Sequence, residues 1–164
     1  MHFSTSVAYP ATTNRVSELW RDESFQQAKA RRAGATKADV TIQGESDLTV
    51  TIRAEIPANL LPQAARRFVG DTLDVTIVEA WQAPREDVRR SGTLNLDIAG
   101  APVRVRGRME LLPVSDGSCT RTIDGEVKAS VPLFSGPIER AAVGAVDDVV
   151  EAEKAIAVEF LTAE

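Results

Sequence analysis

Two neighbouring segments, 38–42 and 48–56, alternate between apolar and polar residues and are separated by four turn-forming residues. The longer segment reads LTVTIRAEI, so every second side chain is apolar. This period is typical of a strand with one buried and one wet face. A short turn between two such strands predicts an antiparallel hairpin. The turn at 44–47 predicts that Ile42 pairs with Leu48, Val40 with Val50 and Ala38 with Ile52.

The same period predicts five further strands. Residues 3–9 indicate a first strand that Pro10 ends, and 94–98, 103–111 and 123–131 indicate three strands joined as hairpins. The nearly continuous apolar stretch 72–82 predicts the remaining strand, and its inward face stays open. That face is either Leu73, Val75, Ile77, Glu79 and Trp81, or Val78 and Ala80.

Three helices complete the predicted elements. Thr12 or Thr13 can cap a short helix after the first strand, and a second short helix around Phe25 ends at Gly34. Gly136 and Pro137 suit the start of a long C-terminal helix, roughly 38 Å in length. Its apolar line at helical spacing comprises Ile138, Ala142, Ala145, Val149, Ala152, Ile156 and Phe160.

This order of elements defines the expected fold class. Strands that follow each other through hairpins exclude a doubly wound parallel sheet. We expect an α+β domain in which a curved, seven-stranded antiparallel sheet wraps around the C-terminal helix. The length of 164 residues favours one domain, 1–164.

The net charge and the cysteine and histidine content exclude several classes of partner and cofactor. The net charge is −5 and no basic stripe is interleaved with aromatic residues, which argues against nucleic-acid binding. Cys119 is the lone cysteine and His2 the lone histidine, so we expect no disulfide, metal site or cofactor. Without an export signal or an apolar span, we expect a cytoplasmic protein with no stable membrane insertion.

Three phrases, Glu79-Ala-Trp81, Gly92-Thr-Leu94 and the nine residues VPLFSGPIE at 131–139, resemble those of a known family. With the order of elements, which covers nearly the whole chain, they are similar to the helix-grip fold of the START-like superfamily, also called SRPBCC. Within it they resemble a bacterial family of uncharacterised function. The superfamily includes lipid-transfer domains and polyketide cyclases, and the resemblance implies an apolar cavity for hydrophobic small molecules between sheet and helix. It carries over no catalytic residue.

Small residues provide independent support for that cavity. Ala142 and Ala145 on the helix, with Gly107 and Gly125 on the strands, leave bulk missing where the two layers meet. Missing bulk predicts either a cavity or closer packing of the helix on the sheet. The expected ligand contacts are Tyr9, Trp20, Phe25, Val50, Ile52, Phe68, Ile77, Glu79, Trp81, Leu96, Val105, Met109, Ile123, Val127, Phe134, Ala142, Ala145 and Val149. Of these, Trp20, Phe25, Phe68, Trp81 and Phe134 are the residues expected to close the cavity mouth, unless they are core.

Glu79 has two readings. If it faces inward, an apolar cleft would raise its pKa and let it orient a polar ligand group or act as a general base, with Arg121 or Tyr9 as partners. If it faces outward, it is a surface residue. The alternating arginines 104, 106 and 108 predict a solvated outer face paired across the strands, with Asp97 opposite Arg104.

The leading hypothesis is a non-enzymatic carrier or sensor of a hydrophobic small molecule or lipid. One alternative is an enzyme of polyketide cyclase or dehydratase type, in which Glu79, Tyr9 or Arg121 moves protons. The other is a protein-interaction module that uses the acidic face of the C-terminal helix. The oligomeric state is not indicated by the sequence.

Overall fold

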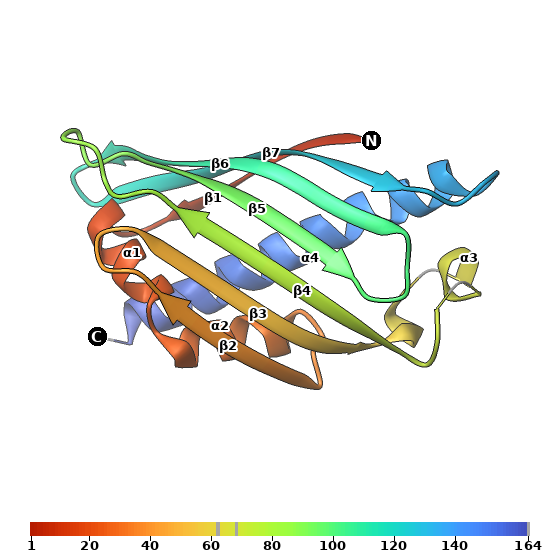
Figure 1. The fold of residues 1–164 in the computed structure, drawn as a ribbon. Coiled ribbons are helices and arrows are strands. Elements are labelled where there is room, and N and C mark those ends of the chain that lie inside the picture. Colours follow the sequence, from red (N-terminus) through yellow and green to blue (C-terminus); the bar gives the residue numbers. More distant parts are fainter. Residues whose placement is uncertain (62, 68, 164) are drawn as a thin grey trace.

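The computed structural model describes residues 1–61, 63–67 and 69–163. A seven-stranded antiparallel sheet has the order β1-β7-β6-β5-β4-β3-β2 (Figure 1). Strands β2 to β7 each pair with their neighbours in sequence, and β1 pairs with β7. The strands are β1 (His2–Tyr9), β2 (Lys37–Gln43), β3 (Leu48–Pro57), β4 (Thr72–Trp81), β5 (Arg90–Ile98), β6 (Val103–Ser115) and β7 (Ser118–Ala129).

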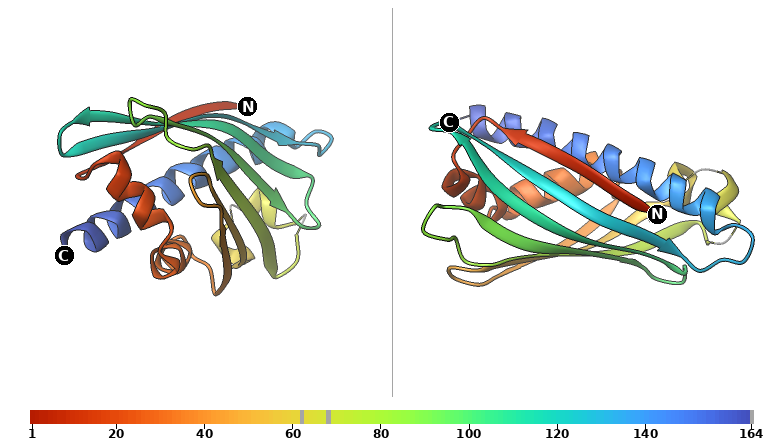
Figure 2. Two further views of the ribbon diagram at one scale, coloured as in Figure 1. Left: turned by 60° about the vertical axis from the view of Figure 1, so that its left-hand side comes forward. Right: turned by 90° about the horizontal axis from the view of Figure 1, so that it is seen from above.

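The helices cover one face of this sheet. In Figure 2 the sheet curves around the long C-terminal helix, with the two short N-terminal helices on the same side. They are α1 (Thr13–Trp20), capped by the side chain of Thr12, and α2 (Glu23–Arg32), capped by Asp22. Between β3 and β4 lie the 3-10 turn η1 (Ala58–Leu60) and α3 (Gln63–Arg66); the C-terminal helix is α4 (Ser135–Thr162). The predicted α+β architecture, with a curved sheet gripping one helix, is therefore confirmed.

The predicted register of the first hairpin is wrong by two residues. Ile42 pairs with Val50 rather than Leu48, so the same side chains face inward but the connecting loop is longer. Arg21 holds this loop: its guanidinium donates hydrogen bonds to the carbonyl oxygens of Gly44, Glu45 and Asp47. Gly44 adopts a φ of +102°, which glycine reaches without steric cost.

The convex face of the sheet carries the paired arginines. Arg104 lies opposite Asp97, as predicted, and Arg106 binds Asp97 diagonally with two hydrogen bonds of 2.9 and 3.2 Å. Arg108 lies opposite Asp124. These charges compensate one another across strands, so the strip is a solvated surface and not an anion site.

Burial along α4 is uneven. Helix α4 packs over β1 and β7. Ile138 is buried in its first turn, and the other buried residues, Val150, Ala152, Glu153, Ile156 and Ala157, lie in its C-terminal half. In the N-terminal half, from Glu139 to Val149, no side chain is fully buried. Ala145 was predicted to face inward but is exposed, because this half of the helix is not covered all along its apolar line.

Large aromatic side chains pack directly against two glycines of the sheet. A Cβ on Gly125 would lie 2.8 Å from the Phe3 ring, and one on Gly92 would lie 2.9 Å from the Trp81 ring. The bulk missing at Gly125 is therefore supplied by Phe3 in close packing. Space over these two positions is filled, so the glycines themselves do not form a cavity.

Candidate ligand-binding site

Five polar side chains meet in the interior, on the face of the sheet that α4 covers. Tyr9 comes from β1, Lys29 from α2, Glu79 from β4, Arg121 from β7 and Glu153 from α4; together we call them the buried charge cluster. None is more than 8% exposed. Five elements that are distant in sequence are therefore joined at one point of the core.

The contacts within the buried charge cluster form a continuous chain. Tyr9 donates a hydrogen bond of 3.0 Å from its hydroxyl to Oε1 of Glu153, and Arg121 forms a hydrogen-bonded ion pair with Oε2 of the same carboxylate. The other carboxylate, Glu79, lies 3.5 Å from Nη1 of Arg121 and 3.6 Å from Nζ of Lys29. Two cations and two anions thus balance each other.

The inward reading of Glu79 is the one that the structure adopts. Val75, Ile77, Glu79 and Trp81 share the inner face of β4, and Glu79 pairs with Val50 on one side and Leu94 on the other. Arg121 and Tyr9, its two suggested partners, both belong to the cluster; Arg121 contacts Glu79 directly, whereas Tyr9 is linked through Glu153. A polar residue in an apolar alternation was therefore a valid signal of the cluster.

Electrostatics fix the charge states of the buried pair. Burial acts to raise the pKa of Glu153, but the Arg121 and Lys29 charges and two donated hydrogen bonds outweigh it, and the net shift is downward. Burial acts to lower the pKa of Arg121, yet Glu153 and its other neighbours raise it overall. For Tyr9, burial raises the pKa well above 10. At neutral pH the pair is ionised and the phenol is protonated.

Several buried polar atoms beside the cluster have no hydrogen-bond partner among the described residues. They are Nε and Nη1 of Arg121, the indole nitrogens of Trp20 and Trp81, and Oε1 of Gln26. Donors outnumber acceptors in this set. Each of these donors can donate a hydrogen bond to an oxygen atom of water or of a bound molecule.

Aromatic residues close the core on the α1 side of the cluster. Trp20 and Trp81 stack with ring centroids 4.6 Å apart and an interplanar angle of 18°, and the guanidinium of Arg121 lies 5.8 Å from the Trp20 ring. Trp20, Phe25 and Trp81 are at most 2% exposed. Of the two alternatives for these three aromatic residues, mouth of a cavity or core, the structure adopts the core.

Apolar side chains on the other side of the cluster are only half-buried. On the inner face of the sheet these are Ile56, Ile77, Leu96 and Val103; on α4 they are Ala142, Val143 and Val146. We call these seven residues the half-buried apolar region. Ile77 and Leu96 pair directly at the centre of the sheet, where full burial is the norm, yet solvent reaches them.

The expected ligand contacts fall into distinct environments. Phe134 is 37% exposed and Ala145 is also exposed, whereas Phe68 lies outside the described residues. Half-buried are Ile77, Leu96, Ala142 and Val149. Fully buried are Tyr9, Trp20, Phe25, Val50, Ile52, Glu79, Trp81, Val105, Met109, Ile123 and Val127.

Two members of the cluster, Lys29 and Glu153, were missed by sequence reasoning. Glu153 lies four residues after Val149 and three before Ile156, so its position on the apolar face of α4 was readable as a buried acid. Lys29 carried no such signal, because α2 has a weakly patterned sequence, QQAKARR.

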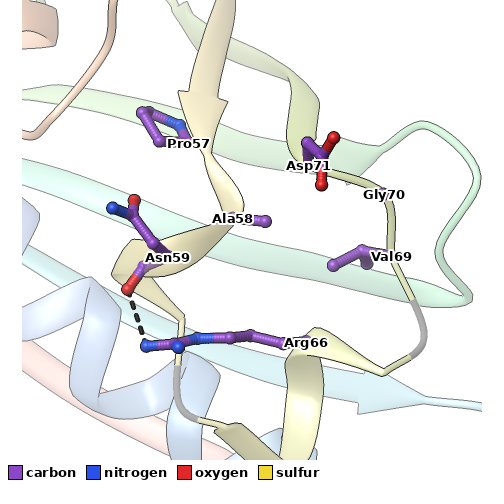
Figure 3. A pocket seen from close by; sticks show the side chains of 7 residues that line it. All are labelled: Pro57, Ala58, Asn59, Arg66, Val69, Gly70 and Asp71. Atoms are coloured by element: carbon purple, nitrogen blue, oxygen red, sulfur yellow. Dashed lines mark hydrogen bonds between the residues drawn. The ribbon is translucent and has the colours of Figure 1, made fainter.

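Two open depressions lie on the surface among the described residues. The larger, of about 420 Å³, is lined by Pro57, Ala58, Asn59, Arg66, Val69, Gly70 and Asp71 (Figure 3). Arg66 spans it and donates hydrogen bonds to the carbonyl oxygens of Asn59 and Leu61. Its guanidinium thus ties α3 to the backbone of Asn59 and Leu61, and none of the residues that line the depression belongs to the buried charge cluster.

Two other kinds of site are absent from the described ranges. No group of three or more His, Cys, Asp and Glu side chains there is arranged to hold a metal ion. No described helix has the length and apolarity needed to cross a membrane.

Solved structures of known proteins share this fold over nearly the whole chain. A START superfamily protein from Mycobacterium smegmatis matches with a TM-score of 0.59 at 13% identity, covering 97% of this chain and 98% of that one. The Zhui aromatase/cyclase from Streptomyces sp. R1128 gives 0.60 at 11% identity, with coverages of 97% and 92%. A STAR-related lipid transfer protein from Xanthomonas axonopodis gives 0.55 at 14%, with coverages of 93% and 85%.

These matches show that the chain has the helix-grip fold of these START-type structures. Residues 4–161 match the family described as a protein of unknown function, DUF2505, and the chain belongs to this family. No curated protein matches the sequence.

Proposed function

We propose that the protein binds a hydrophobic small molecule or lipid between the inner face of the sheet and the N-terminal half of α4, as a carrier or sensor. The supporting observation is the half-buried apolar region, in which Ile77 and Leu96 remain accessible to solvent at the centre of the sheet. Covering this apolar surface with a ligand releases about 25 cal/mol per Å², before the costs of association.

The position of the buried charge cluster would determine how such a ligand is oriented in the site. Glu79 lies next to Ile77 along the inner face of β4, so the cluster borders the half-buried apolar region. An apolar body would lie against the region, and any polar end would point to the cluster. The solved relatives whose names include lipid transfer and aromatase/cyclase activity agree with a hydrophobic ligand for this fold.

Two experiments test the proposal. Native mass spectrometry of the freshly purified protein, followed by organic extraction, is expected to show an apolar compound near one per chain. Titration with the neutral dye Nile red is expected to show binding that a Leu96→Trp substitution weakens roughly tenfold, because the indole occupies the space over the sheet.

Asn95→Trp provides the matched control. Asn95 precedes Leu96 on β5 and faces the opposite side of the sheet, so the same added bulk there leaves dye binding unchanged. Thermal melts of both variants establish that they fold. Equal dye binding by both variants, or a protein that binds neither dye nor extractable compound, contradicts the proposal.

A second candidate, a cyclase- or dehydratase-like enzyme, is favoured by one observation: Glu79 is buried beside an apolar region and contacts two cations. In this reading Glu79 moves a proton of the bound molecule, with Arg121 stabilising the charge. Any turnover found with extracted compounds is expected to be lost in Glu79→Gln but kept in Glu126→Gln, on the outer face. Retention of turnover by Glu79→Gln argues against this candidate.

A further inference from the structure

The loop between β7 and α4 displays an unusual leucine. Leu133 is 96% exposed and has a φ of +68°, a left-handed conformation that a branched side chain rarely adopts. The left-handed backbone conformation and the exposure of an apolar side chain to water each cost free energy. Observed strain of this kind is a reason to look for a function.

Leu133 is part of a continuous apolar tip. Its neighbours Pro132 and Phe134 are also exposed, and we call residues 132–134 the apolar tip. Figures 1 and 2 show this loop at the end of the molecule where α3 lies beside the first turns of α4. The tip therefore projects from one end of the domain and is not part of its core.

Positive charge surrounds the apolar tip although the chain as a whole is acidic. The guanidinium of Arg67 lies 5.6 Å from the Phe134 ring, Arg66 precedes it, and the guanidinium of Arg140 lies beside Gly136. All three arginines are exposed. Asp71 is the acidic residue of the 58–71 segment, so this segment carries one net positive charge.

Acidic residues of α4 do not cancel this local charge. Glu139 accepts a hydrogen bond from the backbone N–H of Ala129 and lies 3.5 Å from the Met1 ammonium, so its charge is engaged. Asp147 comes eleven residues after Gly136 (147 − 136), which is about 16 Å along the helix. That separation exceeds the Debye length of about 10 Å at 0.1 M salt.

We propose that the apolar tip, with Arg66, Arg67 and Arg140, docks on the surface of a phospholipid bilayer that contains anionic headgroups. Leu133 and Phe134 would enter the interfacial layer while Arg67 and Arg140 contact phosphates. Arg66, whose guanidinium binds the carbonyl oxygens of Asn59 and Leu61, would add only its charge. A tip of three residues is too small for a stable protein interface, which buries about 1,200 Å² or more. Contact through the tip is peripheral, in accord with the absence of a membrane-spanning helix among the described residues.

Flotation with lipid vesicles tests this proposal on the whole chain. We expect the protein to float with vesicles of phosphatidylcholine and phosphatidylglycerol at an ionic strength of about 0.1 M, and less at about 1 M. Leu133→Gly is expected to reduce the bound fraction roughly tenfold and to leave the melting temperature equal or higher, because glycine adopts the positive φ freely. Arg67→Gln is expected to weaken binding to the anionic vesicles more than to pure phosphatidylcholine.

The controls separate the tip from other apolar surface and from the ligand site. Val114 is 67% exposed on β6, outside the apolar tip, and Val114→Thr is expected to bind vesicles like the parent. Nile red binding in the absence of vesicles is expected to stay unchanged in Leu133→Gly, so the two proposals fail independently. No flotation of the parent, equal flotation of Leu133→Gly, or a parent dimer that Leu133→Gly dissociates would each overturn the docking proposal.

Discussion

Arg121 on β7 and Glu153 on α4 form an ion pair in which each side chain is only 2% exposed. The pair links the C-terminal half of α4 to the sheet, next to the edge strand β1, where Tyr9 donates to the same carboxylate. Buried charges stabilise only when they compensate each other. Loss of Glu153 leaves Arg121 and Lys29 with Glu79 as their shared carboxylate in the cluster, and thus one uncompensated positive charge in the core.

Glu153→Gln is expected to lower the free energy of unfolding by roughly 3 kcal/mol, since Arg121 would remain charged and buried. Urea denaturation followed by circular dichroism measures this loss. Glu151→Gln, an exposed position on the same helix, is the control and should change stability by less than about 0.5 kcal/mol. Equal free energies of unfolding for the two variants would show that the ion pair does not stabilise the fold.

The acid side of the stability profile should depend on the same carboxylate. The pKa of Glu153 is lower in the folded protein than its ordinary value of 4.5. Its contribution is therefore complete above about pH 4.5 and is lost as the pH falls through the folded pKa. We expect the unfolding free energy of Glu153→Gln to fall less steeply below pH 4.5 than that of Glu151→Gln, measured by urea denaturation at each pH.

Gly92→Ala tests the close packing of Trp81 on β5. A Cβ at Gly92 would lie 2.7 Å from the carbonyl oxygen of Ala80 and 2.9 Å from the Trp81 ring, so the strands or the indole must shift. We expect a loss of about 1 to 3 kcal/mol and a change in tryptophan fluorescence. Gly117→Ala, which meets no atom within 4 Å, should leave both the melting temperature and the spectrum unchanged.

Cys119 should be a slow thiol in the folded state. It is 1% exposed, and burial raises its pKa to about 11, so little thiolate is present at pH 8. Reaction with an aromatic disulfide reagent is expected to proceed far more slowly in buffer than in denaturing urea. Equal rates in both conditions would mean that β7 opens readily at this position.

The fold could be predicted from sequence because its signals are local. Period-two alternation identified the strands, and the apolar line of 138–160 identified α4, so the layer order followed. The register of the first hairpin could not be predicted, because three hydrogen bonds from Arg21 on a different element determine the loop. Hydrogen bonds between elements that are distant in sequence cannot be read from a local pattern.

The candidate site was predictable in part. An inward Glu79 with Arg121 as its partner was one of two alternatives, because the nearly continuous apolar stretch of β4 does not indicate which face is buried; the structure adopts the inward one. Lys29 could not be foreseen, because its place depends on how α2 rotates against the sheet. Ala145 fits the apolar line of α4 but is exposed, since a helix pattern does not state how far along its length the neighbouring layer reaches.

The stacking of Trp20 on Trp81 has a spectroscopic consequence. The chain contains two tryptophans, and their parallel rings at 4.6 Å are close enough for their electronic transitions to couple. Light absorbed and emitted by the protein near 290 to 350 nm, roughly the range of indole, therefore reports on one place, the packed junction of α1 and β4 beside Arg121.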